Sequence, residues 1–350
     1  MEKARFKWVL RERNRKIAAK TEAFTEQQAR RVRSFNSSFK EYSPTPLIEL
    51  TSLAQHLGIK NLFVKDESYR FGLNAFKVLG GSFAIGSYIA NELGEDIDDL
   101  PYMRLVSDEV RSLLGSKTFI TTTDGNHGRG VAWTANRLKQ QAIVYMPQGS
   151  AAERLANIRA EGAQAEITDM NYDDTVRYTS ELAQKNGWII VQDTAWDGYT
   201  RIPLWIMQGY MTMALEAYEQ LPVKPTHIFL QAGVGSLAGS VQGFFADIYG
   251  SSCPLTFIVE PKGADCLYQT AAANDGSLHS VTGRLETIMA GLACGEPNSI
   301  AWEIIGNLSD GFISCPDYTA AQGMRILGNP LAGDTKVSAG ESGAATVGLV

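Results

Sequence analysis

Short apolar runs alternate with amphipathic stretches through the middle of this chain. The strand-like runs occupy residues 117–123, 141–149, 165–170 and 188–194, and helical patterns occupy residues 126–138, 151–163 and 173–187. This alternation is typical of βαβ units, which build a parallel sheet covered by helices. The middle of the chain is therefore predicted to be an α/β lobe.

The same order of elements recurs nearer both ends. Residues 61–67 form a strand-like run, and residues 76–94 indicate a loop that leads into a helix. Residues 226–250 give a strand, a glycine-rich loop and a helix, and residues 254–261 give another buried strand. The sequence predicts two α/β lobes, each with a mainly parallel sheet flanked by helices. Ligand sites are expected where loops leave the carboxyl ends of the strands.

The predicted boundaries make one of the two domains discontinuous. Residues 1–82 and 200–350 form the large domain, and residues 83–199 form the small one. Residues 95–117 keep apolar positions throughout, so we interpret them as an insertion inside the small domain rather than as a linker.

Composition and charge limit the kinds of molecule that the protein is expected to bind. The chain has 350 residues, of which 44% are hydrophobic and 20% charged, a globular composition. Its net charge of -6 is unfavourable for general nucleic-acid binding. No apolar run is long enough for a membrane span, and no secretory signal is recognisable. We expect a soluble, cytoplasmic protein with a small-molecule substrate and with neither a nucleic-acid nor a membrane partner.

The four cysteines predict no metal site. Cys253, Cys266, Cys294 and Cys315 form no pair with metal-ligand spacing. Reduced thiols are the expectation for a reducing compartment.

The first motif with candidate chemistry is "NAFKVLGG". Lys77 follows Phe76 where a loop meets a helix, among apolar neighbours. A partly desolvated amine is a good carbonyl nucleophile. The alternative is a surface lysine whose stem alone is buried.

The second motif is "TTTDGNHG". Gly125 and Gly128 allow a tight turn between a strand and a helix, and the backbone N–H groups of such a turn can hold an anion. Asn126 adds a directional amide. A purely structural turn is the alternative, and His127 is predicted to be a structural residue beside it.

The third motif, "AGVGSLAG", follows a buried strand and opens a helix. This arrangement cradles a phosphate on backbone donors at the positive end of the helix. The glycine spacing differs from the dinucleotide fingerprint, because the third glycine comes one position late. The order of the three motifs is more specific than any one of them.

In this order the motifs resemble those of the fold-type II, tryptophan-synthase-β-like family of pyridoxal-5'-phosphate (PLP) enzymes. The resemblance runs from about Tyr42 to the end of the chain and is greatest to the diaminopropionate ammonia-lyases. It implies PLP as cofactor, a homodimer, Lys77 as the Schiff-base lysine and Asn126 facing the 3'-oxygen of the cofactor. The large domain is then the PLP-binding domain.

The resemblance also implies the remaining site residues. Phe76 would contact the cofactor, and its phosphate would be held by Gly233, Val234, Gly235, Ser236 and Leu237. The substrate carboxylate would lie on a loop of the small domain formed by Thr123, Asp124, Gly125 and Asn126.

The sequence departs from the family pattern at three points. Asp124 stands where most relatives have a small or hydroxylated residue, and the usual GGGGL phosphate loop is GVGSL here. In the family a polar residue on a late segment contacts the pyridine nitrogen, and no such segment follows "GESGAATVGLV" before Val350. Either the sequence is truncated or that contact is absent.

Asp124 indicates the substrate. A carboxylate in a substrate-carboxylate loop repels the substrate, unless a second ammonium compensates. In 2,3-diaminopropionate the β-amine lies near the α-carboxylate. At about 4 Å and an effective dielectric near 20, its attraction to Asp124 is of order 4 kcal/mol. Asp193 in "VQDTAWDGY" is the second candidate; a helix cap for Asp124 and a strand-end aspartate for Asp193 are the alternatives.

The resemblance therefore implies α,β-elimination of 2,3-diaminopropionate to pyruvate and two ammonia. Lys77 would remove the Cα proton of the L isomer, and Asp124 that of the D isomer. The alternatives are a serine or threonine dehydratase, a cysteine-synthase-like β-replacement enzyme, and an inactive PLP-binding protein. Three residues have weaker assignments: Trp196 and Tyr199 are interpreted as loop packing, and Glu260 either lines the cofactor site or caps a helix.

Overall fold

The chain divides into two compact units. The computed structural model describes residues 6–12, 21–123 and 125–350. Unit 1 comprises residues 1–25, 44–69 and 213–350, and unit 2 comprises residues 26–43 and 70–212. Unit 2 contains the whole of the predicted small domain, 83–199, together with flanking segments, one of which carries Lys77.

Unit 2 is built around a four-stranded parallel sheet. Its strands are β4 (Thr118–Thr122), β5 (Gln141–Met146), β6 (Gln164–Ile167) and β7 (Ile189–Ile190). The order is β6-β5-β4-β7, and every neighbouring pair is parallel. These strands coincide with the four apolar runs of the middle of the chain, so the βαβ interpretation is confirmed there.

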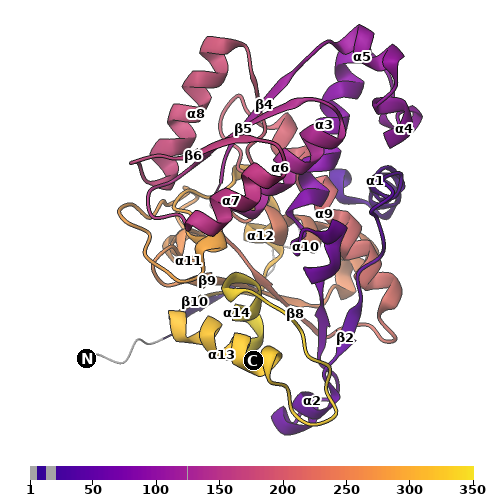
Figure 1. Ribbon diagram of the computed structural model, residues 1–350. Helices are drawn as coiled ribbons and strands as arrows, with labels where there is room; N and C mark the ends of the chain where they lie inside the picture. Colours follow the sequence, from indigo (N-terminus) through magenta and orange to yellow (C-terminus); the bar gives the residue numbers. More distant parts are fainter. Residues whose placement is uncertain (1–5, 13–20, 124) are drawn as a thin grey trace. The chain divides into compact units, whose positions relative to one another are not determined.

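Helices cover this sheet and fill the rest of unit 2. They are α1 (Glu26–Ser37), α3 (Lys77–Leu93), η3 (Ile97–Asp99), α4 (Tyr102–Leu105), α5 (Asp108–Leu114), α6 (Asn126–Arg137), α7 (Ala152–Ala160), α8 (Tyr172–Asn186) and the first part of α9 (Arg201–Gln220). Helices α6 and α8 pack against β4 and β5 (Figure 1). The predicted insertion contains the short helices η3, α4 and α5.

Small residues let the helices of unit 2 approach α3 closely. A Cβ atom added at Gly130 of α6 would lie 2.8 Å from Cα of Val78. One added at Gly209 of α9 would lie 2.3 Å from the carbonyl oxygen of Leu79. Real Cβ atoms do not come this close to backbone. Glycine at these two positions therefore lets α6 and α9 pack directly against the first turn of α3, which carries Lys77.

Unit 1 has its own, mixed sheet. The strands are β1 (Lys7–Leu10), β8 (His227–Gln231), β9 (Leu255–Pro261) and β10 (Gly311–Cys315), in the order β1-β10-β9-β8. Neighbours from β10 to β8 are parallel, whereas the edge strand β1 runs antiparallel to β10. A separate antiparallel pair is formed by β2 (Leu47–Glu49) and β3 (Phe63–Lys65). Each unit thus has a mainly parallel sheet, which confirms the predicted fold class.

The helices of unit 1 include the last three helices of the chain. They are η1 (Glu22–Phe24), α2 (Thr51–Leu57), α10 (Ser236–Tyr249), η4 (Gly250–Ser252), α11 (Cys266–Ala273), η5 (Ala290–Leu292), α12 (Ser299–Leu308), α13 (Asp317–Gly328) and α14 (Glu341–Leu349), with the rest of α9. The short helix η2 (Glu67–Gly72) and α9 contain points where the chain passes from one unit to the other.

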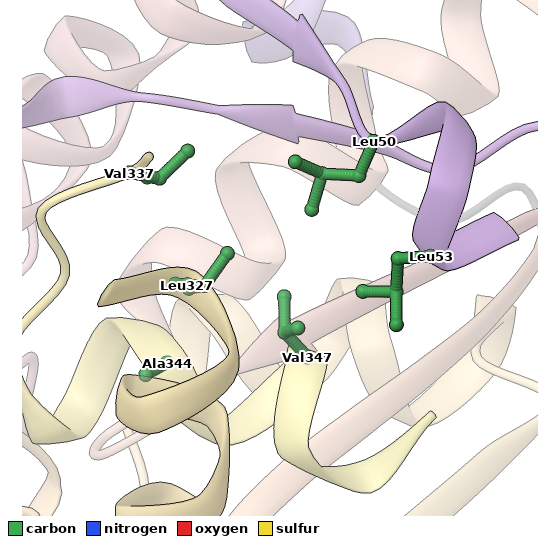
Figure 2. Close-up of a cluster of buried hydrophobic side chains, with 6 residues drawn as sticks. All are labelled: Leu50, Leu53, Leu327, Val337, Ala344 and Val347. Carbon is green, nitrogen blue, oxygen red and sulfur yellow. The ribbon is translucent and has the colours of Figure 1, made fainter. Parts of the chain in front are cut away.

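One hydrophobic cluster of unit 1 joins α2 to the C-terminal helices. Its side chains come from α2 and the residue before it, from α13 and α14, and from the loop between the last two (Figure 2): Leu50, Leu53, Leu327, Val337, Ala344 and Val347. Full burial of a leucine or valine side chain stabilises a fold by roughly 1.5–3 kcal/mol. The cluster therefore holds the last helices to the early segment of unit 1.

In the part of the chain that the structure describes, no helix has the length and apolar character needed to cross a bilayer.

Candidate active site

Lys77 forms a partly buried ion pair at the first turn of α3. Its Nζ contacts Oδ2 of Asp193, and both residues belong to unit 2. The side chain of Lys77 is 21% exposed and that of Asp193 is 7% exposed. The amine itself, and not only its stem, is therefore turned toward a buried carboxylate.

Asp193 is ionised in this setting. Asp193 is the third residue after β7, beyond the carboxyl end of that strand. Burial by itself would raise the pKa of this carboxyl, but the adjacent charge and hydrogen bond of Lys77 outweigh it and lower the pKa to about 2. Removing either partner would leave a poorly solvated charge, which is costly.

His127 lies beside this ion pair. Its Nε2 is 2.7 Å from the carbonyl oxygen of Val191, and its Nδ1 is 3.9 Å from Oδ2 of Asp193. A carbonyl oxygen only accepts, so Nε2 carries the proton. Burial lowers the pKa of His127, which keeps the ring neutral and leaves Nδ1 with a lone pair. The residue is fixed beside the turn, as predicted, with one nitrogen toward Asp193.

Two buried polar atoms near Lys77 have no hydrogen-bond partner among the described residues. They are Nδ1 of His127 and the hydroxyl oxygen of Tyr210. The ring of Tyr210 packs edge-on against Phe76, with centroids 4.9 Å apart. An unpaired buried polar atom is costly and rare in folded proteins. Their position favours a site that receives a polar ligand.

Gln192 connects Asp193 to the strand that precedes the predicted carboxylate loop. Its Oε1 accepts from Oγ1 of Thr121 at 3.0 Å and from the backbone N–H of Thr122 at 2.9 Å. Its Nε2 donates to the hydroxyl of Tyr172 at 2.9 Å, and its backbone N–H donates to the hydroxyl of Tyr199 at 2.8 Å. Both ends of the side-chain amide and the backbone N–H of this buried residue are thus hydrogen-bonded.

The sequence did not single out Gln192 or Tyr172. A lone amide next to an aspartate has no distinctive pattern, and its partners lie far away along the chain. Tyr199 was interpreted as loop packing, and its ring does stack on Trp196, with centroids 4.3 Å apart. Its hydroxyl has the further role of bonding the segment that carries Asp193.

The predicted carboxylate loop leads into the N-terminus of α6. Oγ1 of the buried Thr123 accepts from the backbone N–H of Gly125 at 2.9 Å, and α6 begins at Asn126. Unpaired N–H groups and the positive end of the dipole make a helix N-terminus suited to an anion. Asp124 lies outside the described residues, and its predicted roles stay predictions.

The predicted phosphate loop joins β8 to α10 in unit 1. Gly235 has a φ of +103°, a conformation that side chains rarely adopt, and α10 begins at Ser236. A Cβ atom at Gly233 would lie 3.2 Å from Sγ of Cys294. The loop has the backbone geometry of an anion cradle at a helix N-terminus.

Glu260 is a helix cap. Its carboxylate accepts the backbone N–H of Leu267 at 2.9 Å and of Tyr268 at 2.7 Å, at the start of α11. Burial raises the pKa of Glu260 well above its ordinary value. Of the two interpretations of Glu260, the structure supports the capping role.

None of the predicted site residues that the structure describes lines the surface hollow of about 360 Å³ in unit 1. That hollow lies beside α2, α13 and α14, where its lining includes Leu53, Ile326 and Val347. It has no cationic amine and no glycine turn, and so it lacks the chemistry of the predicted site.

The residues of each unit fit one chemical group of PLP. In unit 2, the amine of Lys77 suits an aldehyde, and the unpaired atoms of His127 and Tyr210 suit polar substituents. In unit 1, the turn at Gly235 and the N-terminus of α10 suit a phosphate.

Comparisons with known proteins agree with this chemistry. The family described as pyridoxal-phosphate dependent enzyme matches residues 39–350. Diaminopropionate ammonia-lyase of Salmonella typhimurium is 53% identical over 324 residues, which cover 91% of this chain and 80% of that protein. L-threonine dehydratase of Staphylococcus aureus is 26% identical over 285 residues, covering 81% of this chain and 71% of that protein.

A solved structure gives the same result. Diaminopropionate ammonia lyase from Escherichia coli, in complex with an aminoacrylate-PLP azomethine reaction intermediate, superposes with a TM-score of 0.89. It is 48% identical, and the match covers 99% of this chain and 86% of that chain. The chain belongs to the family of pyridoxal-phosphate-dependent enzymes and, within it, to the diaminopropionate ammonia-lyases.

Proposed function

We propose that this protein converts 2,3-diaminopropionate to pyruvate and two molecules of ammonia by α,β-elimination with PLP as cofactor. The observation that carries the proposal is the ion pair between Lys77 and Asp193 at the start of α3, in a chain about half identical to diaminopropionate ammonia-lyases. When bound, PLP supplies an electron sink for the carbanion formed at Cα.

Lys77 removes the Cα proton of the L isomer. To act as a base its amine must first be neutral, and the proton it takes from Cα then restores the positive charge. The ionised carboxylate of Asp193 contacts this amine and favours its charged form. Asp193 thereby stabilises the proton at the atom to which it is transferred.

A substrate with a second ammonium fits this charge balance. While Lys77 is neutral, the buried carboxylate of Asp193 lacks the cation that it faces in the structure. The β-ammonium of diaminopropionate can supply one, whereas the β-hydroxyl of serine cannot. Asp193 and Asp124 are thus the two candidate partners of the β-amine, with Asp124 also the base for the D isomer.

The other predicted residues bind the cofactor and the substrate. Gly233, Val234, Gly235, Ser236 and Leu237 hold the phosphate on the first turn of α10. The carboxylate of the substrate binds at the N-terminus of α6, on Thr123, Gly125 and Asn126, and Asn126 also faces the 3'-oxygen of the cofactor. Support comes from the two helix N-termini and from the positive φ at Gly235.

The test is a coupled assay for pyruvate. The purified protein with PLP is given 2,3-diaminopropionate or L-serine, and Lys77→Ala is compared with Lys185→Ala, an exposed lysine of α8. Pyruvate should form from diaminopropionate much faster than from serine, and only Lys77→Ala should abolish it. Faster turnover of serine would assign a dehydratase instead, and bound PLP without turnover would assign an inactive PLP-binding protein.

The cellular setting proposed is the cytoplasm, with a homodimer as the assembly. The cysteines form no disulfide among the described residues, which supports a reducing compartment. Size-exclusion chromatography with light scattering tests the homodimer.

A further inference from the structure

Asn298 joins two helix N-termini within unit 1. It lies just before α12, is fully buried, and its Oδ1 accepts from the backbone N–H groups of Ile300 at 2.9 Å and Ala301 at 3.2 Å. This is an ordinary N-cap, which stabilises a helix by about 1 kcal/mol. The cap uses only one of the polar atoms of the side chain.

The remaining donors of Asn298 bind the predicted phosphate loop. Its Nδ2 donates to Oγ of Ser236 at 2.8 Å, and its backbone N–H donates to the carbonyl oxygen of Val234 at 2.8 Å. Asn298 therefore makes one side-chain and one backbone bond to two residues on either side of Gly235.

Each bond orients a donor of the loop. The carbonyl of Val234 and the N–H of Gly235 belong to one planar trans peptide, in which they point in opposite directions. Holding the carbonyl on Asn298 therefore aims the N–H of Gly235 away from Asn298. Because an amide nitrogen only donates, Ser236 accepts in its bond to Nδ2, and this bond orients its hydroxyl group.

We propose that Asn298 is a positioning residue for the cofactor phosphate, which turns the N–H of Gly235 and the hydroxyl of Ser236 toward the anion. The inference rests on the proposed phosphate role of this loop. Asn298 itself is bonded to the loop and to its own helix, and acts through the loop.

Asn298→Asp separates the two roles. Aspartate caps a helix as well as asparagine does, so the bonds to Ile300 and Ala301 are retained. Its carboxylate cannot donate to Ser236 and instead attracts the hydroxyl proton, while adding a negative charge behind the loop. Asn298→Ser is the second variant, because serine also caps but lacks the amide. Asn307→Asp, later in α12, is the matched control.

The experiment measures the affinity of the cofactor-free protein for PLP and for pyridoxal, which lacks the phosphate, by absorbance titration. The wild type and Asn307→Asp should prefer PLP. Both Asn298 variants should lose about ten- to a hundredfold of that preference, with an unchanged affinity for pyridoxal.

Two other outcomes overturn different statements. If the wild type binds PLP and pyridoxal equally, the phosphate role of the loop is wrong, and the role of Asn298 with it. If the wild type prefers PLP and both Asn298 variants keep the full preference, only the positioning role is wrong. A large drop in the unfolding midpoint with unchanged preference would make Asn298 a helix cap alone.

Discussion

Nδ1 of His127 lies 3.9 Å from Oδ2 of Asp193 and carries no proton, because the single proton of the neutral ring is on Nε2 and is donated to Val191. A charged imidazole would gain from Asp193, but it would also be repelled by Lys77 and lose its hydration. Burial is the largest of these effects and lowers the pKa of His127. The neutral ring therefore does not compete with Lys77 for the charge of Asp193.

The buried His127 should make stability depend on pH. The unfolded chain binds a proton at this residue below the ordinary histidine pKa of 6.5, and the folded protein does not. Stability is therefore fully present above pH 6.5 and falls with decreasing pH, by at most about 1.4 kcal/mol per pH unit. Urea unfolding of the cofactor-free protein at pH 7.5 and at lower pH, on a grid of about half a unit, measures this slope.

His127→Gln should flatten that slope, since the Nε2 amide of glutamine can still donate to Val191. His56→Gln, at an exposed position, is the control and should leave the slope unchanged. Equal slopes for the wild type and His127→Gln would show that another group causes the pH dependence.

Asp193→Asn should reduce activity and lower the unfolding free energy of the cofactor-free protein. The variant keeps the size of the side chain but leaves the amine of Lys77 without its counter-charge. Loss of one partner of a buried pair costs about 3–5 kcal/mol of folding stability, and the partial exposure of Lys77 reduces this cost. Because Asp193 stabilises the proton that Lys77 accepts, and a positioned base contributes about 10²–10⁴-fold to a rate, a loss of roughly a hundredfold in kcat/KM is expected. Asp197→Asn, exposed on the same loop, should behave like the wild type.

The pH dependence of the Asp193 contribution follows from its depressed pKa. The folded pKa of about 2 lies below the ordinary value of 3.8, so the stabilisation is complete above pH 3.8 and is lost as the pH falls toward 2. In a His127→Gln background, where the histidine does not titrate, the difference in unfolding free energy between Asp193 and Asp193→Asn should therefore be constant from pH 5 to 7. A difference that changes over that range contradicts the assignment.

Much of the fold was predictable from local sequence. The strands of unit 2 are apolar runs bounded by turn residues, and α3 begins at Lys77, where the glycine-containing loop ends. The pattern did not identify the edge strand β1 or its partner β10, because their pairing spans most of the chain and leaves no local signal.

The candidate site was predictable only where it contains motifs. Lys77 and the glycine loop belong to short, continuous motifs that can be recognised in a single sequence. Gln192 and Asn298 act through single amides whose partners are brought together by folding, as in the bonds from Gln192 to Thr122 and from Asn298 to Ser236. Amides of this kind have no sequence signature, and the contacts alone reveal them.

Asp124 should distinguish the two isomers of the substrate. If Lys77 removes the Cα proton on one face and Asp124 on the other, Asp124→Asn should reduce turnover of D-diaminopropionate at least about tenfold more than that of the L isomer. Pyruvate formation from each isomer, measured as kcat/KM, is the readout. Equal losses for both isomers would remove Asp124 as the base and leave it as a partner of the β-amine.

Gln192→Leu should disturb the site without touching the reacting atoms. Leucine fills a similar volume but removes one hydrogen bond from each of three groups, the N–H of Thr122 and the hydroxyl groups of Thr121 and Tyr172. Each such bond contributes about 0.5–1.5 kcal/mol, so a lower unfolding midpoint is expected. Tyr172→Phe removes one of these bonds and should lower the midpoint less.

The two variants separate structural from positional effects on catalysis. Because Gln192 binds both the strand before Thr123 and the segment with Asp193, its loss should raise KM and lower kcat together, whereas Tyr172→Phe should leave both near the wild-type values. Gln192→Glu tests the same point with a side chain of the same shape, whose carboxylate can accept hydrogen bonds from Thr122 and from Tyr172. Compared with Gln192→Leu, this variant should recover more of the stability than of the activity, because it adds a negative charge next to Asp193. Full activity in Gln192→Leu would show that the two segments keep their geometry without this amide.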